Sequence, residues 1–467
     1  MKFKVSSLLA LLLMLIGMAA NDLTAVRAAR PSQQESPLRL SEPVEAIVAD
    51  LERFIPEYMR EQEIPGVAIA LIRDGKVVWT EGFGVANSLT RQPITPETLF
   101  EVASNSKVVT AYIALRLVDQ GLLSLDEPLN ATLPEPWLPP SEYRDSITLR
   151  HVLSHSSGLG HSPTSRDSLF APGRGYSYSG VGFQYLQAVI EHATGQSLEQ
   201  VAQEMVFVPL GMSSSSFVNR PELTPRTANG HLWLIVPALL FAVLYGVASV
   251  IVGFFGLLIL RIRTGRWRPT RRMVSGACAV AFVLSLLPAF VLLGEVGWLE
   301  FAWVIALCGF LFVAAFALAF VAGRVIILRL YTERPGGQIV LTIVWSALIV
   351  VGLAVFGSRV ANIPVPRWPG VPAEAAGSVR ATVDDMATFL IELSNPQYLG
   401  PEMAAQLQTP QVRLKSDLTW GLGPGIQHSQ QGDALWQWGQ HIDFQSVMII
   451  YPEHCLLYTS PSPRDRS

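Results

Sequence analysis

The chain has 467 residues, a length that leaves room for two domains. Half of the residues are apolar and only 15% are charged, which is lean for a water-soluble enzyme. The net charge of -3 argues against nucleic-acid binding, and the three cysteines lie in apolar runs or near the C-terminus. The polar segments therefore lack the cysteines needed for a disulfide framework or a cysteine-based zinc site.

The N-terminal residues 1–29 have the pattern of a secretory signal peptide. Lys2 and Lys4 precede the apolar run 5–20, and small residues at 25–29 offer a cleavage site. An uncleaved anchor helix is the alternative, because the run is near the lower length limit for crossing a bilayer. Both interpretations predict that the following segment is exported.

The first polar segment, residues 30–231, contains patterns of both helix and strand. An amphipathic helix is expected over 43–62. Two apolar stretches within 66–79 flank an Asp74-Gly75 turn and predict a hairpin. Residues 107–120 then have the apolar spacing of a further helix.

The block 232–360 contains four long apolar stretches, each long enough to cross a hydrocarbon core as a helix. They cover roughly residues 232–260, 273–294, 301–328 and 338–357. The first and third connections are rich in arginine and the second carries only Glu295 and Glu300, so the positive-inside rule places both flanking polar segments outside. We therefore expect an all-α, four-helix transmembrane insertion, with the lipid bilayer as a partner.

The second polar segment, residues 361–454, again contains a helix and strands. Thr382 begins a helix that ends near residue 393, with the pattern of an N-cap. Residues 420–423 and 446–451 have strand character. With the first polar segment, this order predicts one α+β domain whose sheet draws on both segments.

Residues 455–467 resemble the translation of a sequencing adapter rather than natural protein sequence. We expect them not to belong to the native chain, and we expect the sheet to lack its last strand for that reason.

Ser104 and Lys107 form a Ser-x-x-Lys pattern where the helix of 107–120 begins. Three residues make nearly one helical turn, so the two side chains are expected to lie on the same face. A serine hydroxyl is a weak nucleophile that needs a neighbour to take its proton, and a lysine amine can do this. The pattern alone is also typical of an N-cap serine beside a solvated lysine.

Further motifs in the same order give the chain a resemblance to the serine β-lactamase and penicillin-binding protein family, and especially to its class C-like and esterase branch. The resemblance spans about 43–220 and 375–453 and includes Ile147–Leu159, Pro172-Gly173, Tyr176–Phe183, Pro209–Met212, Ala376–Asp385, Asp443–Ser446 and Tyr451–Glu453. It implies a β-lactamase-like fold, an antiparallel sheet flanked by helices plus a helical subdomain. It also implies Ser104 as the catalytic nucleophile and Lys107 as its activating partner.

By the same resemblance, Tyr178 matches the tyrosine of the family's Tyr-x-Asn motif, a second proton-transfer group. Tyr176 is the competing candidate, but the spacing to Gly182-Phe183 favours Tyr178. The backbone N–H groups of Ser104 and Gln440 would form the oxyanion hole.

Two departures affect the expected substrate-binding residues. Gly180 replaces the asparagine of Tyr-x-Asn, which removes a side-chain amide. Gln437-Trp438-Gly439 replaces the family's Lys-Thr-Gly, so that site has no cation or small hydroxyl for a substrate carboxylate. Both changes argue against β-lactamase activity more than against ester or amide hydrolysis.

His151 and His155 have the i, i+4 spacing of a metal pair, but no third ligand or His-Glu-x-x-His glutamate accompanies them. We assign them to structure and expect neither a metal nor another cofactor.

The leading hypothesis is a multi-pass protein of the cytoplasmic membrane whose serine hydrolase domain faces outward. Through a Ser104 acyl-enzyme it would act on a small-molecule or cell-wall peptide substrate, as a carboxypeptidase, esterase or D-amino-acid amidase. The alternative is a catalytically weak membrane receptor with a degenerate penicillin-binding-like pocket. A transporter is disfavoured, because the apolar stretches hold almost no ionisable residue in mid-membrane. The sequence contains no signal for an oligomeric state.

Overall fold

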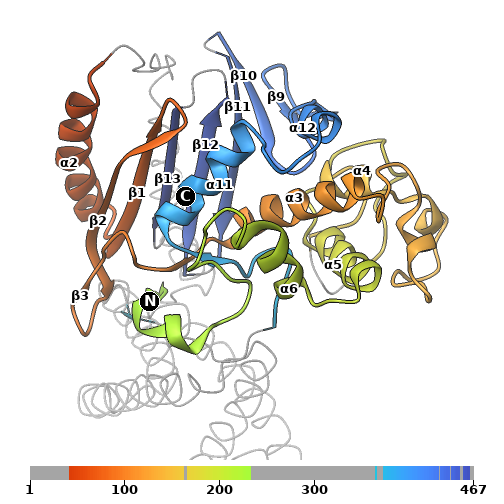
Figure 1. The fold of residues 1–467 in the computed structure, drawn as a ribbon, viewed down its shortest axis with the longest axis horizontal. Helices are drawn as coiled ribbons and strands as arrows, with labels where there is room; N and C mark the ends of the chain where they lie inside the picture. The colour runs from red at the N-terminus through yellow and green to blue at the C-terminus, as the bar shows by residue number, and fades with distance from the viewer. Residues whose placement is uncertain are drawn as a thin grey trace, which may run out of the picture. The chain divides into compact units, whose positions relative to one another are not determined.

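The computed structural model describes residues 42–161, 166–232, 363–364, 372–430, 432–441, 443–452 and 456–462. The expected signal peptide of residues 1–29 and most of the block 232–360 lie outside these residues. Within them, the secondary structure lies mainly in one large sheet and in the helices packed against it (Figure 1).

Nine of the described strands form one antiparallel sheet in the order β3-β2-β1-β13-β12-β11-β10-β9-β8. The N-terminal strands are β1 (Gly66–Arg73), β2 (Lys76–Asn87) and β3 (Gln92–Pro93). The C-terminal strands are β8 (Val412–Arg413), β9 (Leu418–Trp420), β10 (Gly425–Ser429), β11 (Gly432–Gln440), β12 (Gln445–Tyr451) and β13 (Leu456–Ser462). Segments far apart in sequence therefore share one sheet, as predicted for an α+β domain.

The N-terminal hairpin and helix follow their local sequence patterns. The turn between β1 and β2 holds Asp74 at φ 53° and Gly75 at φ 66°, the left-handed conformations of a tight hairpin turn. The helix α2 (Val44–Glu61) packs a small apolar cluster, which includes Ile55 and Met59, against one face of the hairpin. Its bounds confirm the helix predicted over 43–62.

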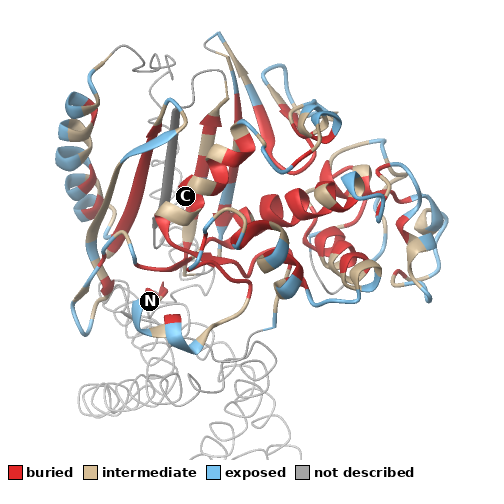
Figure 2. Ribbon diagram, viewed as in Figure 1, coloured by how far each residue is buried: buried red, intermediate tan, exposed pale blue. Residues whose placement is uncertain are grey.

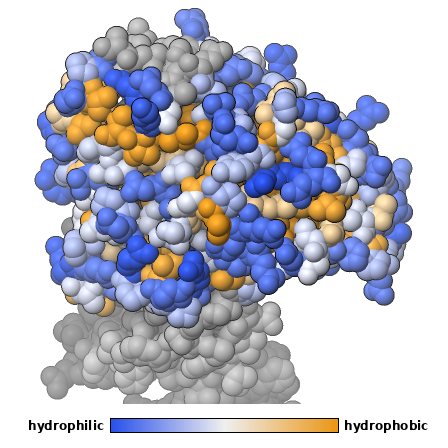
Figure 3. All heavy atoms as spheres, viewed as in Figure 1, coloured by the Kyte–Doolittle hydropathy of each residue, from blue (hydrophilic) through white to orange (hydrophobic). Residues whose placement is uncertain are grey.

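The other face of the sheet is covered by helices. The helix α11 (Val383–Ser394) contacts four strands of the sheet, and Thr382 caps its first turn, as predicted. Behind it, α3 (Ser106–Asp119) is buried along most of its length (Figure 2). On the face shown in Figure 3, hydrophilic side chains cover most of the described surface, and apolar side chains reach it in separate groups.

A helical part surrounds α3 at the far side from the hairpin (Figure 1). Its helical segments are η2 (Leu129–Thr132), η3 (Arg144–Ser146), α4 (Leu149–Leu153), α5 (Gly180–Thr194), α6 (Leu198–Ala202), η4 (Gln203–Phe207) and α12 (Pro401–Leu407). Apolar residues of these segments join those of the sheet and α3 in the main hydrophobic core. The segment η5 (Pro221–Arg226) lies instead beside β3, where the Pro225 carbonyl accepts from Gln92 Nε2 at 3.0 Å.

Two short strand pairs connect the first polar segment to the second. Strand β4 (Phe100–Glu101) pairs with β7 (Arg380–Ala381), and β5 (His231–Leu232) pairs with β6 (Ile363–Pro364). The β4–β7 pair matters for function, because β4 leads directly into the turn that carries Ser104.

The predicted transmembrane insertion requires correction. Among the described helices, none combines the length and the apolar character needed to cross a membrane. The expectation rested on hydropathy alone, and nearly all of the four stretches fall outside the described residues. The fold class is accordingly a β-lactamase-like α+β fold, and the multi-pass localisation inferred from the insertion is withdrawn with it.

The C-terminal residues also depart from expectation. The sheet was expected to lack its last strand, yet Leu456–Ser462 forms β13 between β1 and β12, with Ala70 opposite Thr459. Strand pairing uses backbone N–H and C=O groups that every residue except proline carries, so an atypical sequence is compatible with this position.

Candidate active site

Ser104 lies in a single 3₁₀ turn, η1 (Ala103–Asn105), which precedes α3. The residue before it, Ala103, has φ 46°, a conformation that is strained for a residue with a Cβ. Ser106 holds this turn in place: its hydroxyl donates to the Ala103 carbonyl at 2.6 Å and accepts from the Val379 N–H at 2.9 Å. The strain is thus maintained by contacts from α3 and from the second polar segment.

Lys107 lies in the first turn of α3 with its amine directed at Ser104. Its Nζ atom is 3.1 Å from Ser104 Oγ and donates to the Ala376 carbonyl at 2.7 Å. The residue is only 2% exposed. Burial lowers the pKa of Lys107 to about 8, although the negative charge of Glu374 raises it in part. An amine of this pKa is neutral in about a tenth of the molecules at pH 7 and in a growing fraction as the pH rises, and the neutral form can accept a proton.

Tyr178 lies beside the pair, just before the N-cap residue of α5. Its ring centroid is 5.1 Å from Lys107 Nζ, and its hydroxyl interacts with Ser104 and accepts a 3.1 Å hydrogen bond from Gln437 Nε2. Burial raises the pKa of Tyr178, although the hydrogen bonds from Ser104 and Gln437 lower it in part. The group is therefore a neutral hydroxyl, not a phenolate, at neutral pH.

An aromatic cluster supports Tyr178 from behind. The His155 and Tyr178 rings are 4.3 Å apart, and Trp420 contacts His155, Tyr176 and Tyr178 at 5.1 to 5.9 Å. Tyr176, the competing candidate, packs in this cluster, and burial raises its pKa well above the usual range. Of the two tyrosines, Tyr178 is the one in contact with Ser104 and Lys107.

The two histidines considered as a metal pair have other contacts. His151 Nδ1 accepts from the Thr148 N–H at 3.2 Å in the capping box of α4. His155 is fully buried, and its Nδ1 accepts from the Ser179 N–H at 3.1 Å. Burial holds the pKa of His155 well below its usual range, so the ring is a neutral spacer behind Tyr178.

Strand β11 approaches the nucleophile turn through Gly439. A Cβ atom at this position would lie 2.2 Å from the Val102 carbonyl oxygen and 3.0 Å from the Ser104 nitrogen. Only glycine allows so close an approach without displacing backbone. The next residue, Gln440, ends β11, so its backbone is brought beside the turn of Ser104.

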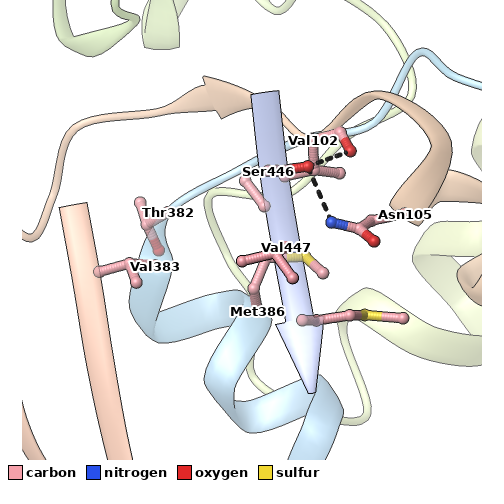
Figure 4. A pocket seen from close by; sticks show the side chains of 9 residues that line it. Val102, Asn105, Thr382, Val383, Met386, Ser446 and Val447 are labelled. Atoms are coloured by element: carbon pink, nitrogen blue, oxygen red, sulfur yellow. Dashed lines mark hydrogen bonds between the residues drawn. The ribbon is translucent and has the colours of Figure 1, made fainter. Parts of the chain in front are cut away.

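The turn of Ser104 is also braced from β12. The Ser446 hydroxyl donates to the Val102 carbonyl at 2.7 Å and accepts from Asn105 Nδ2 at 2.8 Å (Figure 4). These residues line a small, mainly apolar pocket with α11 residues such as Met386. Ser104, Lys107 and Tyr178 do not line this pocket. It lies among the residues that brace the turn of Ser104 and is separate from the reacting groups.

The remaining predicted substrate-binding residues, Gln437, Trp438 and Gly180, differ in whether they face the reacting groups. Gln437 is fully buried and faces Tyr178, whereas Trp438 is 57% exposed and lies on the opposite face of β11 by strand alternation. Gly180 begins α5, and a Cβ there would lie 3.2 Å from the His161 carbonyl oxygen and 3.7 Å from its Nδ1. His161 thus lies where an asparagine side chain at position 180 would extend.

Sequence reasoning missed several groups around this centre. These are the Ala376 carbonyl that accepts a hydrogen bond from Lys107, His161 beside Gly180, and the ion-pair cluster of buried Arg380 with the partly exposed Glu101 and His441. A backbone carbonyl has no sequence signature. The charged residues could have been found only by noticing ionisable side chains next to Ser104 and Gln440.

Comparisons with known proteins bear on the family and the fold of the chain. A family model described as Beta-lactamase matches residues 51–252. Esterase EstB of Burkholderia gladioli is 31% identical over 207 residues, which cover 37% of this chain and 52% of the esterase. Protein flp of Staphylococcus aureus (strain MRSA252) is 24% identical over 201 residues, covering 39% of this chain and 40% of that protein. The chain thus spans about half the length of these curated relatives, or less.

A solved structure supports the fold alone. The octameric penicillin-binding protein homologue from Pyrococcus abyssi superposes with a TM-score of 0.57 at 18% identity, covering 90% of this chain and 74% of that one.

Proposed function

We propose, from the relationship of this chain to the serine β-lactamases and penicillin-binding proteins, that it hydrolyses carboxylic esters through an acyl-enzyme formed on Ser104. The observation that carries the proposal is the 3.1 Å separation of Lys107 Nζ from Ser104 Oγ inside a buried environment. Such a pair supplies the nucleophile and base that acyl transfer needs.

In the first half-reaction, neutral Lys107 takes the proton of the Ser104 hydroxyl as Oγ attacks the ester carbonyl carbon. The backbone N–H groups of Ser104 and Gln440 would stabilise the negative charge that develops on the carbonyl oxygen. The carbon–oxygen bond to the alcohol then breaks. The leaving alkoxide receives a proton from the Tyr178 hydroxyl, which is reprotonated from Lys107.

In the second half-reaction, a water molecule attacks the acyl carbon while its proton passes to Lys107 directly or through Tyr178. The bond to Ser104 Oγ breaks and Oγ takes up this proton, which releases a carboxylic acid. Protons and electrons balance over the cycle, because one ester and one water yield one acid and one alcohol.

The replacement at position 437 favours esters over β-lactams as substrates. The family's cation at this position would hold a substrate carboxylate, but Gln437 is neutral and its amide is occupied by the Tyr178 hydroxyl. An ester without a carboxylate loses nothing at this site. The similarity to an enzyme named an esterase agrees with this preference.

The proposal is tested on the full chain with a fluorophosphonate probe and with p-nitrophenyl butyrate, a chromogenic β-lactam and a D-alanyl-D-alanine peptide as competing substrates. We expect stoichiometric labelling and ester turnover, both lost in Ser104→Ala. Ser213→Ala, which alters an exposed serine, is the matched control and retains both.

Efficient turnover of the β-lactam or the peptide with little ester hydrolysis would overturn the substrate class. Absence of Ser104-dependent labelling and turnover would overturn the enzyme and favour a catalytically weak binding protein.

A further inference from the structure

We propose that His441 is a positioning residue for the Ser104 site. It links the end of β11, where the Gln440 N–H of the oxyanion hole lies, to the segments that hold Ser104 and Lys107. This inference rests on the proposed function, because it concerns how the same site keeps its geometry. The argument comes from three contacts of His441, one through its backbone N–H and two through its half-buried imidazole.

The first contact concerns the end of β11. His441 directly follows Gln440, the last residue of the strand, and its backbone N–H donates to the Phe444 carbonyl at 2.8 Å. This bond closes the short turn that leads into β12. The position of the Gln440 N–H therefore depends on how His441 is held.

The second contact links His441 to the nucleophile turn. His441 Nδ1 lies 3.1 Å from Glu101 Oε2, and the other carboxylate oxygen lies 2.5 Å from Arg380 Nη2. Glu101 is the last residue of β4, three positions before Ser104, and it pairs with Arg380 across the β4–β7 ladder. Arg380 is only 6% exposed, so the carboxylate is clamped between two partners.

The third contact reaches the segment that holds Lys107. A Cβ placed on Gly377 would lie 3.0 Å from His441 Nε2 and 3.4 Å from Glu374 Oε2. The imidazole therefore packs against the backbone beside Ala376, whose carbonyl accepts from Lys107 Nζ. One residue thus links the end of β11, through its backbone, with the segments of Ser104 and Lys107, through its ring.

The charges around the ring favour its protonated form. Burial alone would lower the pKa of His441, but the hydrogen bond from His441 to Glu101 and the charges of Glu101, Asp443 and Glu374 raise it. Burial likewise opposes ionisation of Glu101, yet its partners His441 and Arg380 lower its pKa. Asp443, beside His441, has a pKa raised to about 7 by burial and by the charge of Glu101.

The ring does not act on substrate in this scheme; it holds the segments that do. Loss of the His441–Glu101 bond is expected to displace the Gln440 N–H from its place near Ser104 and so to weaken transition-state stabilisation more than substrate binding. The signature is a fall in kcat with little change in KM.

The test compares His441→Phe, which removes the donor, with His441→Asn, which keeps a neutral N–H donor near the position of Nδ1. The matched control is His428→Phe. His428 also bonds a carboxylate, Asp433, at 2.8 Å and is similarly exposed, at 32% against 35%, but it pairs with the opposite end of β11. All three are assayed in the full chain with p-nitrophenyl butyrate.

We expect His441→Phe to lower kcat by about tenfold or more, up to the about 10²- to 10³-fold loss that follows removal of an oxyanion donor, and to leave KM within about twofold. His441→Asn is expected to recover most of kcat but to lose the decline of kcat that accompanies deprotonation of His441 at high pH. His428→Phe should match the wild type in both respects.

An active wild type whose kcat and pH profile are unchanged in both His441 variants would overturn this inference and leave the proposed hydrolase intact. An inactive wild type would instead overturn the proposed function, and the inference with it. If His441→Phe does not fold, the pH profile of His441→Asn decides alone: retention of the alkaline decline would contradict the role.

Discussion

The side-chain amide of Gln437 donates a 3.1 Å hydrogen bond to the hydroxyl of Tyr178, although 259 residues separate the two in sequence. A neutral donor therefore occupies the position at which related enzymes are expected to carry a cation. The contact orients Tyr178 toward Ser104 and Lys107 without adding positive charge to the site. Its consequences for proton transfer and substrate choice can be measured.

Replacing Gln437 with leucine removes this donor while keeping the side chain similar in size. Loss of one hydrogen bond is worth about 0.5 to 1.5 kcal/mol, so kcat for an ester should fall by about two- to tenfold. Gln427→Leu, an exposed change on the neighbouring strand β10, serves as the control. Equal kcat values in the two variants would show that Gln437 does not orient Tyr178 during turnover.

The buried Lys107 amine predicts the pH dependence of the reaction. Only the neutral amine can take the Ser104 proton, and burial lowers its pKa to about 8. The value of kcat/KM should therefore rise with pH up to about pH 8, before the decline expected at higher pH from deprotonation of His441. Lys107→Arg cannot deprotonate and should lower kcat/KM by about 10²- to 10⁴-fold. The exposed change Lys76→Arg should leave the profile intact, and a flat profile in the wild type would exclude Lys107 as the base.

The same lysine should reduce the stability of the folded chain. Its pKa is 10.5 when exposed and about 8 in the fold, so the unfolded state binds the proton more tightly. The resulting loss in the free energy of unfolding is complete below about pH 8, diminishes as the pH rises, and vanishes above about pH 10.5. At 1.36 kcal/mol per unit, the full cost is about 3 kcal/mol.

Lys107→Met should therefore raise the free energy of unfolding below pH 8 by up to about 3 kcal/mol, less the contribution of the lysine's own hydrogen bonds. Urea titrations of the full chain at pH 7 and pH 10 measure the gain and its decline. Lys76→Met, at an exposed site, should change neither value appreciably. A destabilised Lys107→Met at pH 7 would contradict the expected cost.

The close approach of β11 to the nucleophile turn predicts that Gly439 tolerates no side chain. A methyl group would overlap the Val102 carbonyl and the Ser446 hydroxyl, at 2.2 and 2.5 Å. Gly439→Ala should cost about 1 to 3 kcal/mol of stability and should also lower kcat, because the strand must move away from Ser104. Gly160→Ala is the control, since a Cβ there meets no atom within 4 Å. Unchanged kcat in Gly439→Ala would mean that the turn adjusts without moving the site.

Local patterns were sufficient to predict much of the fold. The helix α2, the β1–β2 hairpin, and the starts of α3 and α11 follow from apolar periodicity, an Asp-Gly turn and an N-cap threonine. Residues 420–423 were expected to be a strand, but β9 ends at Trp420 and Gly423 adopts φ 120°. Hydropathy also predicted membrane spans that are not supported among the described helices. Hydropathy averaged over a stretch of sequence measures how apolar the stretch is. It does not indicate whether lipid or protein surrounds that stretch in the fold.

The proximity of Ser104 and Lys107 was predictable from sequence because both lie within one helical turn, where spacing sets geometry. The choice of Tyr178 over Tyr176 followed from motif spacing. Both rings pack against Trp420, and Tyr178 is the one that lies beside Lys107. Three hydrogen bonds of the site join residues more than 250 positions apart. They are the bonds from Lys107 to the Ala376 carbonyl, from Gln437 to Tyr178 and from His441 to Glu101. Such contacts depend on strand register and on burial, which shifts the pKa values of the groups involved. Only the folded chain sets either of them.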